Sequence, residues 1–138
     1  MPRRVARTRN NGEWTEARYN SFIKSALRSA TMRWGPITLA KRNANRGRGK
    51  YLCAGCGNIG PASIRIDGKK FNNAVVDHID PIVDPAIGFN GWDNLISRMF
   101  CEVDKLQVLC KPCHDEKTKK ETAVAKARRA KEKNDDGL

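Results

Sequence analysis

The sequence lacks a long apolar stretch. None of its 138 residues lies in a run that resembles a membrane-spanning helix, and the opening Met-Pro-Arg-Arg is not followed by the apolar segment of a secretory signal. We therefore expect a cytoplasmic protein without a membrane partner. In a reducing compartment, paired cysteines bind metal ions more often than they form disulfides.

Acidic residues are also scarce. The chain has 27 Lys and Arg against 15 Asp and Glu, which gives a formal net charge of +12. The excess is concentrated in residues 1–50, which hold 13 basic and 2 acidic residues, whereas residues 51–113 hold 6 and 7. This asymmetry indicates a polyanionic partner, with nucleic acid favoured over a membrane surface. The alternative is a charge that serves only solubility, although solubility does not require the charge to be concentrated in one third of the chain.

Four of the five cysteines form two Cys-x-x-Cys pairs. Cys53 pairs with Cys56, and Cys110 pairs with Cys113. A structural zinc site requires four soft ligands in a tetrahedron, and each pair presents two thiolates from a tight turn. We predict one structural Zn²⁺ per chain, the alternatives being two disulfides or four unrelated buried thiols. Cys101 has no partner at this spacing and is interpreted as a free thiol of the core.

The length fits one modest domain with some additional chain. We expect an α+β fold in four segments, which are a disordered basic arm (1–13), a helical basic extension (14–50), a central module (51–125) and a charged tail (126–138).

The basic extension has the pattern of two helices. Apolar residues at spacings of three and four predict a helix from an N-cap at Thr15 to about Arg33. Gly35 and Pro36 interrupt this pattern, and a shorter helix is expected over residues 37–45.

The central module has the pattern of strands followed by helices. Alternation predicts a strand over 63–67, a turn at Asp67-Gly68 and a return strand over 71–77. Prolines and glycines predict a loop over 81–91. The remaining expected elements are a helix over 92–100, a strand over 106–109 and a helix from Pro112 that frays near Lys126.

Asp77 and His78 lie between the two cysteine pairs, and His114 follows the second pair directly. Hydrolysis of a phosphodiester requires an activated water and a cation that neutralises charge on the phosphate. His78 has the chemistry of a general base, and Asp77 and His114 can bind a divalent ion that keeps waters and phosphate oxygens as its other ligands. Each histidine taken alone is better interpreted as a structural or surface residue, so the hypothesis depends on their joint position.

The chain resembles the HNH endonuclease family over residues 51–119, on the segments VDHIDP (76–81) and LQVLCKPCHDEK (106–117). The resemblance implies a ββα-metal core around one catalytic ion, stapled by a four-cysteine zinc site. It makes His78 the general base, and it makes Asp77 and His114 the ligands of Mg²⁺, Mn²⁺ or a similar ion. Cleavage in this family leaves 5′-phosphate and 3′-hydroxyl ends.

The sequence departs from the family at one position. The middle asparagine of the family usually precedes the second strand, where this chain has Lys105. Asn94 is the best substitute, with the expected catalytic role of orienting His78 through hydrogen bonds. The alternative for Asn94 is an ordinary residue of a helix surface.

The chain also resembles small HNH proteins encoded by bacteriophages. That resemblance implies cleavage or nicking of double-stranded DNA in an infected bacterial cell, with packaging or replication proteins as partners. No helix-turn-helix or finger helix is recognisable, so we expect salt-sensitive binding through the DNA backbone. The residues expected to contact DNA are Arg3, Arg4, Arg7, Arg9, Arg46, Arg48, Lys50 and Lys117.

Two other functions explain part of the pattern. A zinc-stabilised nucleic-acid-binding module without activity explains the cysteines and the charge but leaves Asp77, His78 and His114 as a coincidence. A zinc-ribbon interaction protein leaves the charge asymmetry without a role. Only the nuclease requires a second, weaker and exchangeable ion.

Overall fold

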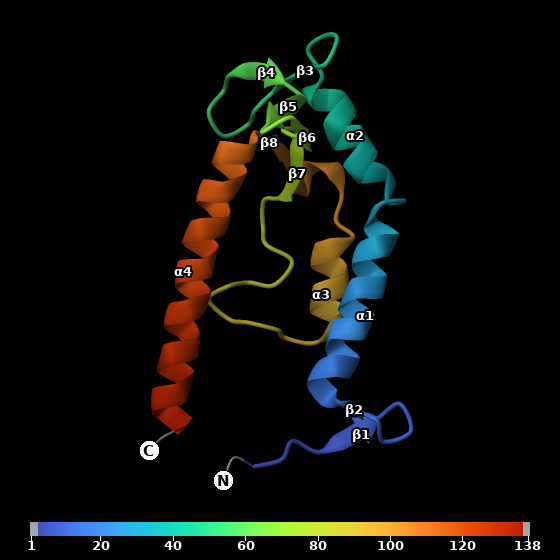
Figure 1. Ribbon diagram of the computed structural model, residues 1–138, viewed down its shortest axis with the longest axis vertical. Helices are drawn as coiled ribbons and strands as arrows, with labels where there is room; N and C mark the ends of the chain where they lie inside the picture. Colours follow the sequence, from blue (N-terminus) through green and yellow to red (C-terminus); the bar gives the residue numbers. More distant parts are fainter. Residues whose placement is uncertain (1–2, 137–138) are drawn as a thin grey trace. The chain divides into compact units, whose positions relative to one another are not determined.

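The chain divides into two compact units. The computed structural model describes residues 3–136, and the contacts within the chain separate Met1–Trp34 from Gly35–Leu138 (Figure 1). We call them the N-terminal unit and the C-terminal unit. Within residues 3–136, no helix combines the length and the apolar character needed to cross a membrane.

A β-hairpin opens the N-terminal unit. β1 (Arg7–Arg9) pairs antiparallel with β2 (Trp14–Thr15). The Asn-Asn-Gly turn between them has positive φ at residues 10–12, a conformation that asparagine and glycine tolerate better than other residues. This finding corrects the disordered arm expected over residues 1–13, because the second half of that segment forms a hairpin.

The first helix, α1 (Glu16–Thr31), follows the hairpin at once. The hydroxyl of Thr15 accepts a hydrogen bond from the backbone N–H of Arg18 at 3.2 Å, which confirms the predicted N-cap. Trp14 packs against Phe22 from the helix, with the ring centroids 5.1 Å apart. The hairpin and the helix therefore stabilise each other within the N-terminal unit.

Three two-stranded antiparallel sheets form the β part of the C-terminal unit. The paired strands are β3 (Lys50–Leu52) with β4 (Ile59–Pro61), β5 (Ser63–Ile66) with β6 (Lys69–Asn72), and β7 (Val75–His78) with β8 (Leu106–Leu109). The predicted Asp67-Gly68 turn joins β5 to β6, and both turn residues have positive φ, as the favoured two-residue hairpin turn requires.

The return strand predicted over 71–77 is two strands that belong to different sheets. Asn73 separates them and is buried. Its side-chain amide donates to the carbonyl of Pro61 at 2.9 Å, and its side-chain oxygen accepts from the backbone N–H of Lys111 at 3.0 Å. Because Asn73 is held by these two contacts, β6 ends before it and β7 begins after it with β8 as a new partner.

The helices of the C-terminal unit match the predicted positions more closely than the strands do. They are α2 (Gly35–Ala44), α3 (Trp92–Met99), a 3₁₀ helix (Val103–Lys105) and α4 (Lys111–Asp136). The last of these is longer than predicted, because it continues beyond Lys126. Arg128 supports the added turns, since it pairs with Glu132 one turn later and donates to the carbonyl of Pro85 at 3.1 Å.

A small core holds the C-terminal unit together. Leu106, Val108 and Leu109 of β8 are buried against Tyr51 and against Ala40 of α2. The β7–β8 sheet contacts both α2 and α4 and lies between them (Figure 1). Both cysteine pairs and the Asp77-His78 dipeptide therefore adjoin the same short sheet.

Candidate functional site

The two predicted cysteine pairs come together in one cluster. Cys53 follows β3, Cys110 follows β8 and Cys113 lies in the first turn of α4. The Sγ atoms of the four cysteines lie within 4.8 Å of one another, and all four thiols are free. Zn–S bonds of about 2.3 Å in a tetrahedron place the sulfurs about 3.8 Å apart, so the cluster can hold a metal ion. Within residues 3–136, no second group of three or more His, Cys, Asp or Glu side chains meets the same distance.

Backbone contacts bring the two pairs together. The N–H of Ala54 donates to the carbonyl of Val108 at 2.9 Å, and the N–H of Cys110 donates to Sγ of Cys53 at 3.2 Å. Gly55 lies so close to the second pair that an added Cβ would meet Cβ and Sγ of Cys113 at 3.2 Å. The sequence therefore needs glycine here for the approach of the two segments.

The thiols do not ionise alike. Burial favours the neutral form of Cys53, but backbone N–H groups, first that of Cys110, outweigh this effect and lower its pKa to about 6. The pKa of Cys113 is raised to about 12, mainly because its thiol is hydrogen-bonded to Cys110. The thiolate is the form that binds a metal, and the N–H groups around Cys53 favour that form.

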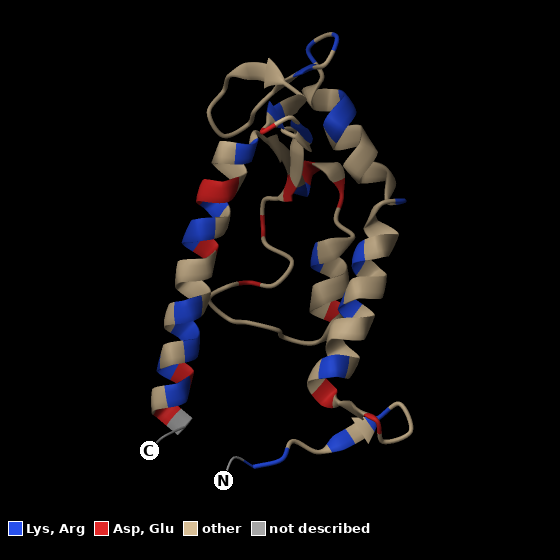
Figure 2. Ribbon diagram, in the orientation of Figure 1, with Lys and Arg blue, Asp and Glu red and all other residues tan. Residues whose placement is uncertain are grey.

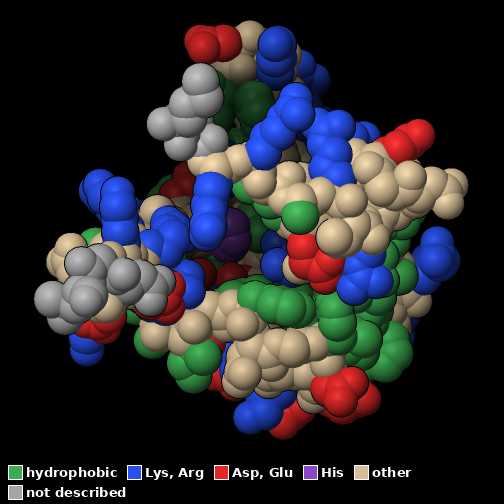
Figure 3. Space-filling view, turned by 90° about the horizontal axis from the view of Figure 1, so that it is seen from below, with side chains coloured by type: hydrophobic (Ala, Val, Ile, Leu, Met, Phe, Trp, Pro, Cys, Tyr) green, Lys and Arg blue, Asp and Glu red, His purple; other side chains and the backbone are tan. Residues whose placement is uncertain are grey.

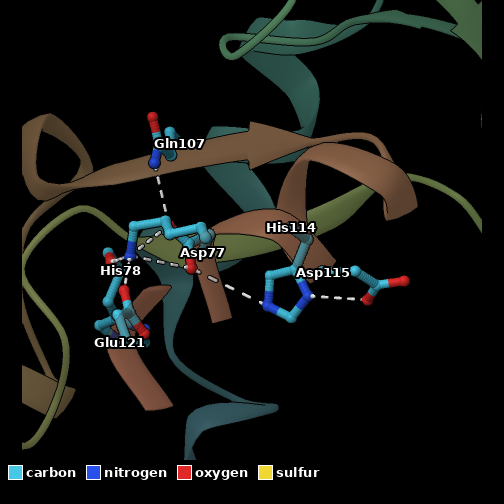
Figure 4. A network of polar contacts seen from close by, with 7 residues as sticks. Asp77, His78, Gln107, His114, Asp115 and Glu121 are labelled. Carbon is cyan, nitrogen blue, oxygen red and sulfur yellow. Dashed lines mark hydrogen bonds and ion pairs between the residues drawn. The ribbon is translucent and has the colours of Figure 1, made fainter. Parts of the chain in front are cut away.

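The second site joins Asp77 to His114. Asp77 lies in β7 opposite Gln107 of β8, and His114 lies in the first turn of α4. Nε2 of His114 is 3.9 Å from Oδ1 of Asp77, and their side chains are 33% and 11% exposed. Figure 4 shows the two side chains turned toward each other from different elements. The fold thus brings together the two residues predicted to bind the catalytic ion.

Lys117 occupies the centre of this network. Its Nζ lies 3.1 Å from Oδ2 of Asp77, donates to the carbonyl of His78 at 3.1 Å and pairs with Glu121. Gln107 donates to the same carboxylate oxygen at 2.9 Å. Burial alone would lower the pKa of Lys117, but its contacts with Glu121 and Asp77 outweigh burial and raise it. An ion bound to Asp77 would therefore share that carboxylate with an ammonium group.

The side chain of His78 points away from the Asp77–His114 pair. Successive side chains of a strand leave it on opposite faces, and Nε2 of His78 lies 2.9 Å from the carbonyl of Met99 at the end of α3. A carbonyl only accepts, so Nε2 carries the proton and Nδ1 keeps its lone pair. Within the described residues, no hydrogen bond or ion pair joins the His78 ring to Asp77 or His114. Both histidines are partly exposed, and Figure 3 shows histidine surface on the face seen from below.

Asn94 does not take the predicted place beside His78. It is exposed on α3, and the group that contacts the His78 ring is a backbone carbonyl of the same helix. Lys105 contributes through its backbone, because its carbonyl accepts a hydrogen bond from the N–H of Ile79 at 3.0 Å. The chain just after His78 is thus held by main-chain hydrogen bonding to the residue before β8.

The residues expected to contact DNA are divided between the two units. Arg3, Arg4 and Arg7 are exposed in the N-terminal unit, where Arg9 donates two hydrogen bonds to Glu16. Arg48 and Lys50 are exposed before and within β3, and Arg46 donates to the carbonyls of Asn43 and Asn45. Lys117 is engaged with two carboxylates.

Comparisons of the chain with protein-family models, with curated proteins and with solved structures gave no match.

Three groups of the site were not identified from the sequence. Gln107 lies within the quoted motif, but its role depends on the register that places it opposite Asp77. Glu121 follows Lys117 by four residues. Because this spacing brings side chains of a helix together, the ion pair between them could have been predicted from the sequence. The Met99 carbonyl carries no signal, because every residue has one.

Proposed function

We propose that the protein is a divalent-metal-dependent DNA endonuclease of the HNH type, stabilised by a structural zinc ion. The observation that carries the proposal is the pairing of Asp77 with His114 across β7 and α4 at 3.9 Å. The order β7, β8, α4 is the order of elements that the family resemblance implies. The cysteine cluster lies at the junction of β8 and α4 and fixes the helix that carries His114.

Zinc is the proposed ion of the cysteine cluster. Four thiolates in a tetrahedral arrangement suit zinc better than they suit Mg²⁺ or Ca²⁺, which prefer oxygen ligands. On binding, the ion would displace the protons of those thiols that are neutral without it, because cysteine binds a metal as the thiolate. Its role here is structural, because all four positions are filled by protein ligands.

Asp77 and His114 would hold the catalytic ion, which is proposed to be Mg²⁺, Mn²⁺ or a similar cation. When bound, such an ion neutralises charge on the scissile phosphate and on the leaving 3′ oxygen. Asp77 supplies a carboxylate oxygen that Gln107 already orients, and His114 supplies Nε2. The ammonium group of Lys117 lies 3.1 Å from the same carboxylate. When the ion binds, this group would move away from Asp77, and it could then contact a phosphate oxygen.

His78 accepts the proton of the attacking water at Nδ1. The contact with the Met99 carbonyl supports this role, because in the neutral imidazole it favours the tautomer whose lone pair is on Nδ1. His78 is the last residue of β7, so its ring leaves the strand at the same end as the Asp77 carboxylate. The expected products carry 5′-phosphate and 3′-hydroxyl ends, and the expected setting is the cytoplasm of an infected bacterial cell, with phage packaging or replication proteins as partners.

A second function is favoured by the state of Asp77. A carboxylate that already contacts Lys117 and Gln107, beside a His78 ring directed at Met99, also suits a site that no longer binds a catalytic ion. The protein would then be a zinc-stabilised nucleic-acid-binding module without activity.

Cleavage of supercoiled plasmid separates the two functions. The wild type is compared with Asp77→Asn in EDTA and in Mg²⁺, Mn²⁺ or Ni²⁺. Glu116→Gln is the control, because it also removes one carboxylate from the start of α4 but Glu116 pairs with Lys120 on the helix surface. We expect metal-dependent nicking or linearisation by the wild type and by the control, with a loss of at least 100-fold in Asp77→Asn. DNA retention without cleavage in any ion would reject the nuclease.

A further inference from the structure

The C-terminal unit carries a concentration of positive charge outside the Asp77–His114 pair, and five of its residues belong to the basic excess of residues 1–50. Residues 35–73 hold eight Lys and Arg and a single acidic residue, Asp67. All eight basic residues are exposed. Figure 2 shows this charge on α2, on the loop before β3 and on the β5–β6 hairpin.

These charges are less neutralised than those of α4. Along α4, four basic residues each pair with a carboxylate four residues away on the same helix, and they are Lys111, Lys117, Lys120 and Arg128. Within the part of the chain that the structure describes, no ion pair joins any of the eight basic residues of 35–73 to a carboxylate. Unpaired surface cations are the ones that contribute fully to the binding of a polyanion.

A cavity of about 280 Å³ lies within this basic region. Two lysines line it, Lys41 of α2 and Lys50 of β3, together with Asn45, Ser63 and Asn72. No carboxylate lines the cavity. Asn45 and Asn72 use their side-chain oxygens to accept backbone N–H groups, so their NH₂ groups remain as donors toward a ligand. The lining thus offers ammonium, amide and hydroxyl donors, which are the groups that bind phosphate oxygens.

The β5–β6 hairpin extends the same donor-rich face. Ser63 pairs with Asn72 at the base of the hairpin, and Arg65 pairs with Lys70 two residues further along. Because side chains alternate, these four residues share one face of the hairpin. Like charges directly opposite each other destabilise a sheet, and the Arg65–Lys70 pair has no acidic neighbour in register. A bound anion would therefore reduce the repulsion between Arg65 and Lys70.

We propose that Lys41, Lys50, Arg65 and Lys70 form a phosphate-binding face that contacts the DNA backbone at a distance from the cleavage site. This inference rests on the proposed function and adds a place where the substrate is held. Ala74 also lines the cavity, and it lies directly before β7, four residues before His78 at the end of that strand. Four residues span about 13 Å, which is well within one turn of a DNA duplex, about 34 Å.

The test is binding of a 30-base-pair duplex in buffer without added Mg²⁺ or Mn²⁺, so that the structural zinc stays bound and only affinity is measured. Zinc-loaded wild type is compared with Lys50→Ala/Lys70→Ala over a range of salt concentrations. Lys119→Ala/Arg129→Ala is the control, because it removes the same charge from exposed positions of α4. Each lost phosphate contact lowers the salt slope by about 0.9. We expect the first variant to lose about 1.8 from the slope and at least fivefold in affinity at 0.1 M salt, and the control less than twofold.

The outcomes separate this inference from the nuclease proposal. Equal affinity and slope in Lys50→Ala/Lys70→Ala and in the control would overturn the phosphate-binding face, whether or not the wild type cleaves plasmid. A selective loss of affinity, with a wild type that cleaves nothing, would support the face and leave a binding module rather than an enzyme. Circular dichroism of both variants verifies that each is folded.

Discussion

The effect of Cys56→Ser on stability distinguishes a protein that a bound metal ion stabilises from one that is stabilised by its hydrophobic core alone. Cys56 is the exposed member of the cysteine cluster. Without a metal ion, its substitution would act like other surface changes and alter the free energy of unfolding by no more than about 0.5 kcal/mol. Any larger effect must come from a ligand that the serine no longer supplies well.

The expected effect with a metal ion is much larger. Structural zinc contributes about 10–16 kcal/mol of apparent binding free energy in zinc-finger peptides, which is comparable to the whole stability of a small domain, about 5–15 kcal/mol. The cluster also joins two segments 57 residues apart in the chain, from Cys53 to Cys110. We expect loss of one ligand in four to cost at least about 3 kcal/mol, which corresponds to a fall in Tm of at least about 12 °C for a domain of this size.

The assay measures zinc content and thermal unfolding together. Wild type, Cys56→Ser and Cys101→Ser are purified with zinc, their metal content is determined by mass spectrometry, and unfolding is followed by circular dichroism. Cys101→Ser is the matched control, because Cys101 lies outside the cluster. One zinc per chain is expected in the wild type and the control only. A Cys56→Ser protein with one tightly bound zinc and the melting curve of the wild type would refute the staple.

Three further substitutions test the packing. Asn73→Ala leaves two backbone groups without their side-chain partners and should cost about 2–4 kcal/mol in urea denaturation; a cost below about 1 kcal/mol would contradict this role. Gly88→Ala brings the new Cβ against the guanidinium of Arg128 at a φ of +85°, so it should cost about 1–3 kcal/mol in the free energy of unfolding. The cost should be smaller when Arg128 is also replaced by alanine, and equal costs in both backgrounds would argue against the close approach. The hydrogen bond from Arg9 holds the pKa of Glu16 below its ordinary value of 4.5, so the contribution of this pair to stability is present above pH 4.5 and is lost as the pH falls through the lower, folded-state value. An NMR titration of Glu16 should therefore shift upward in Arg9→Ala, and an unshifted curve would count against the pair.

The sequence predicted best those features that depend on local chemistry. The Thr15 cap, the Asp67-Gly68 turn and β8 follow from residue type and spacing alone, and the structure confirms them. The predicted interruption of the first helix is present at residues 32–34, whereas Gly35 and Pro36 are the first two residues of α2. The meeting of the two cysteine pairs followed from the geometry that one ion would require.

The features that sequence reasoning missed depend on contacts between distant segments. The split of the return strand depends on Asn73, whose partners Pro61 and Lys111 lie far away in the chain. The length of α4 depends on Arg128, which reaches the loop at Pro85. The orientation of His78 depends on where α3 ends, because Met99 supplies the carbonyl that its ring contacts. No local pattern encodes these partners.

The most direct test of the proposed function is single-turnover cleavage of plasmid by His78→Ala in Mn²⁺ or Mg²⁺. Removal of a general base slows proton transfer by about 10²–10⁴-fold, whereas DNA binding without added Mg²⁺ or Mn²⁺ should stay within about twofold of the wild type. Asn94→Ala is the control, because the structure leaves Asn94 exposed on α3, and its rate should remain near that of the wild type. Cleavage by His78→Ala at the wild-type rate would contradict the assignment of the base and, with it, the account of this site as an HNH nuclease.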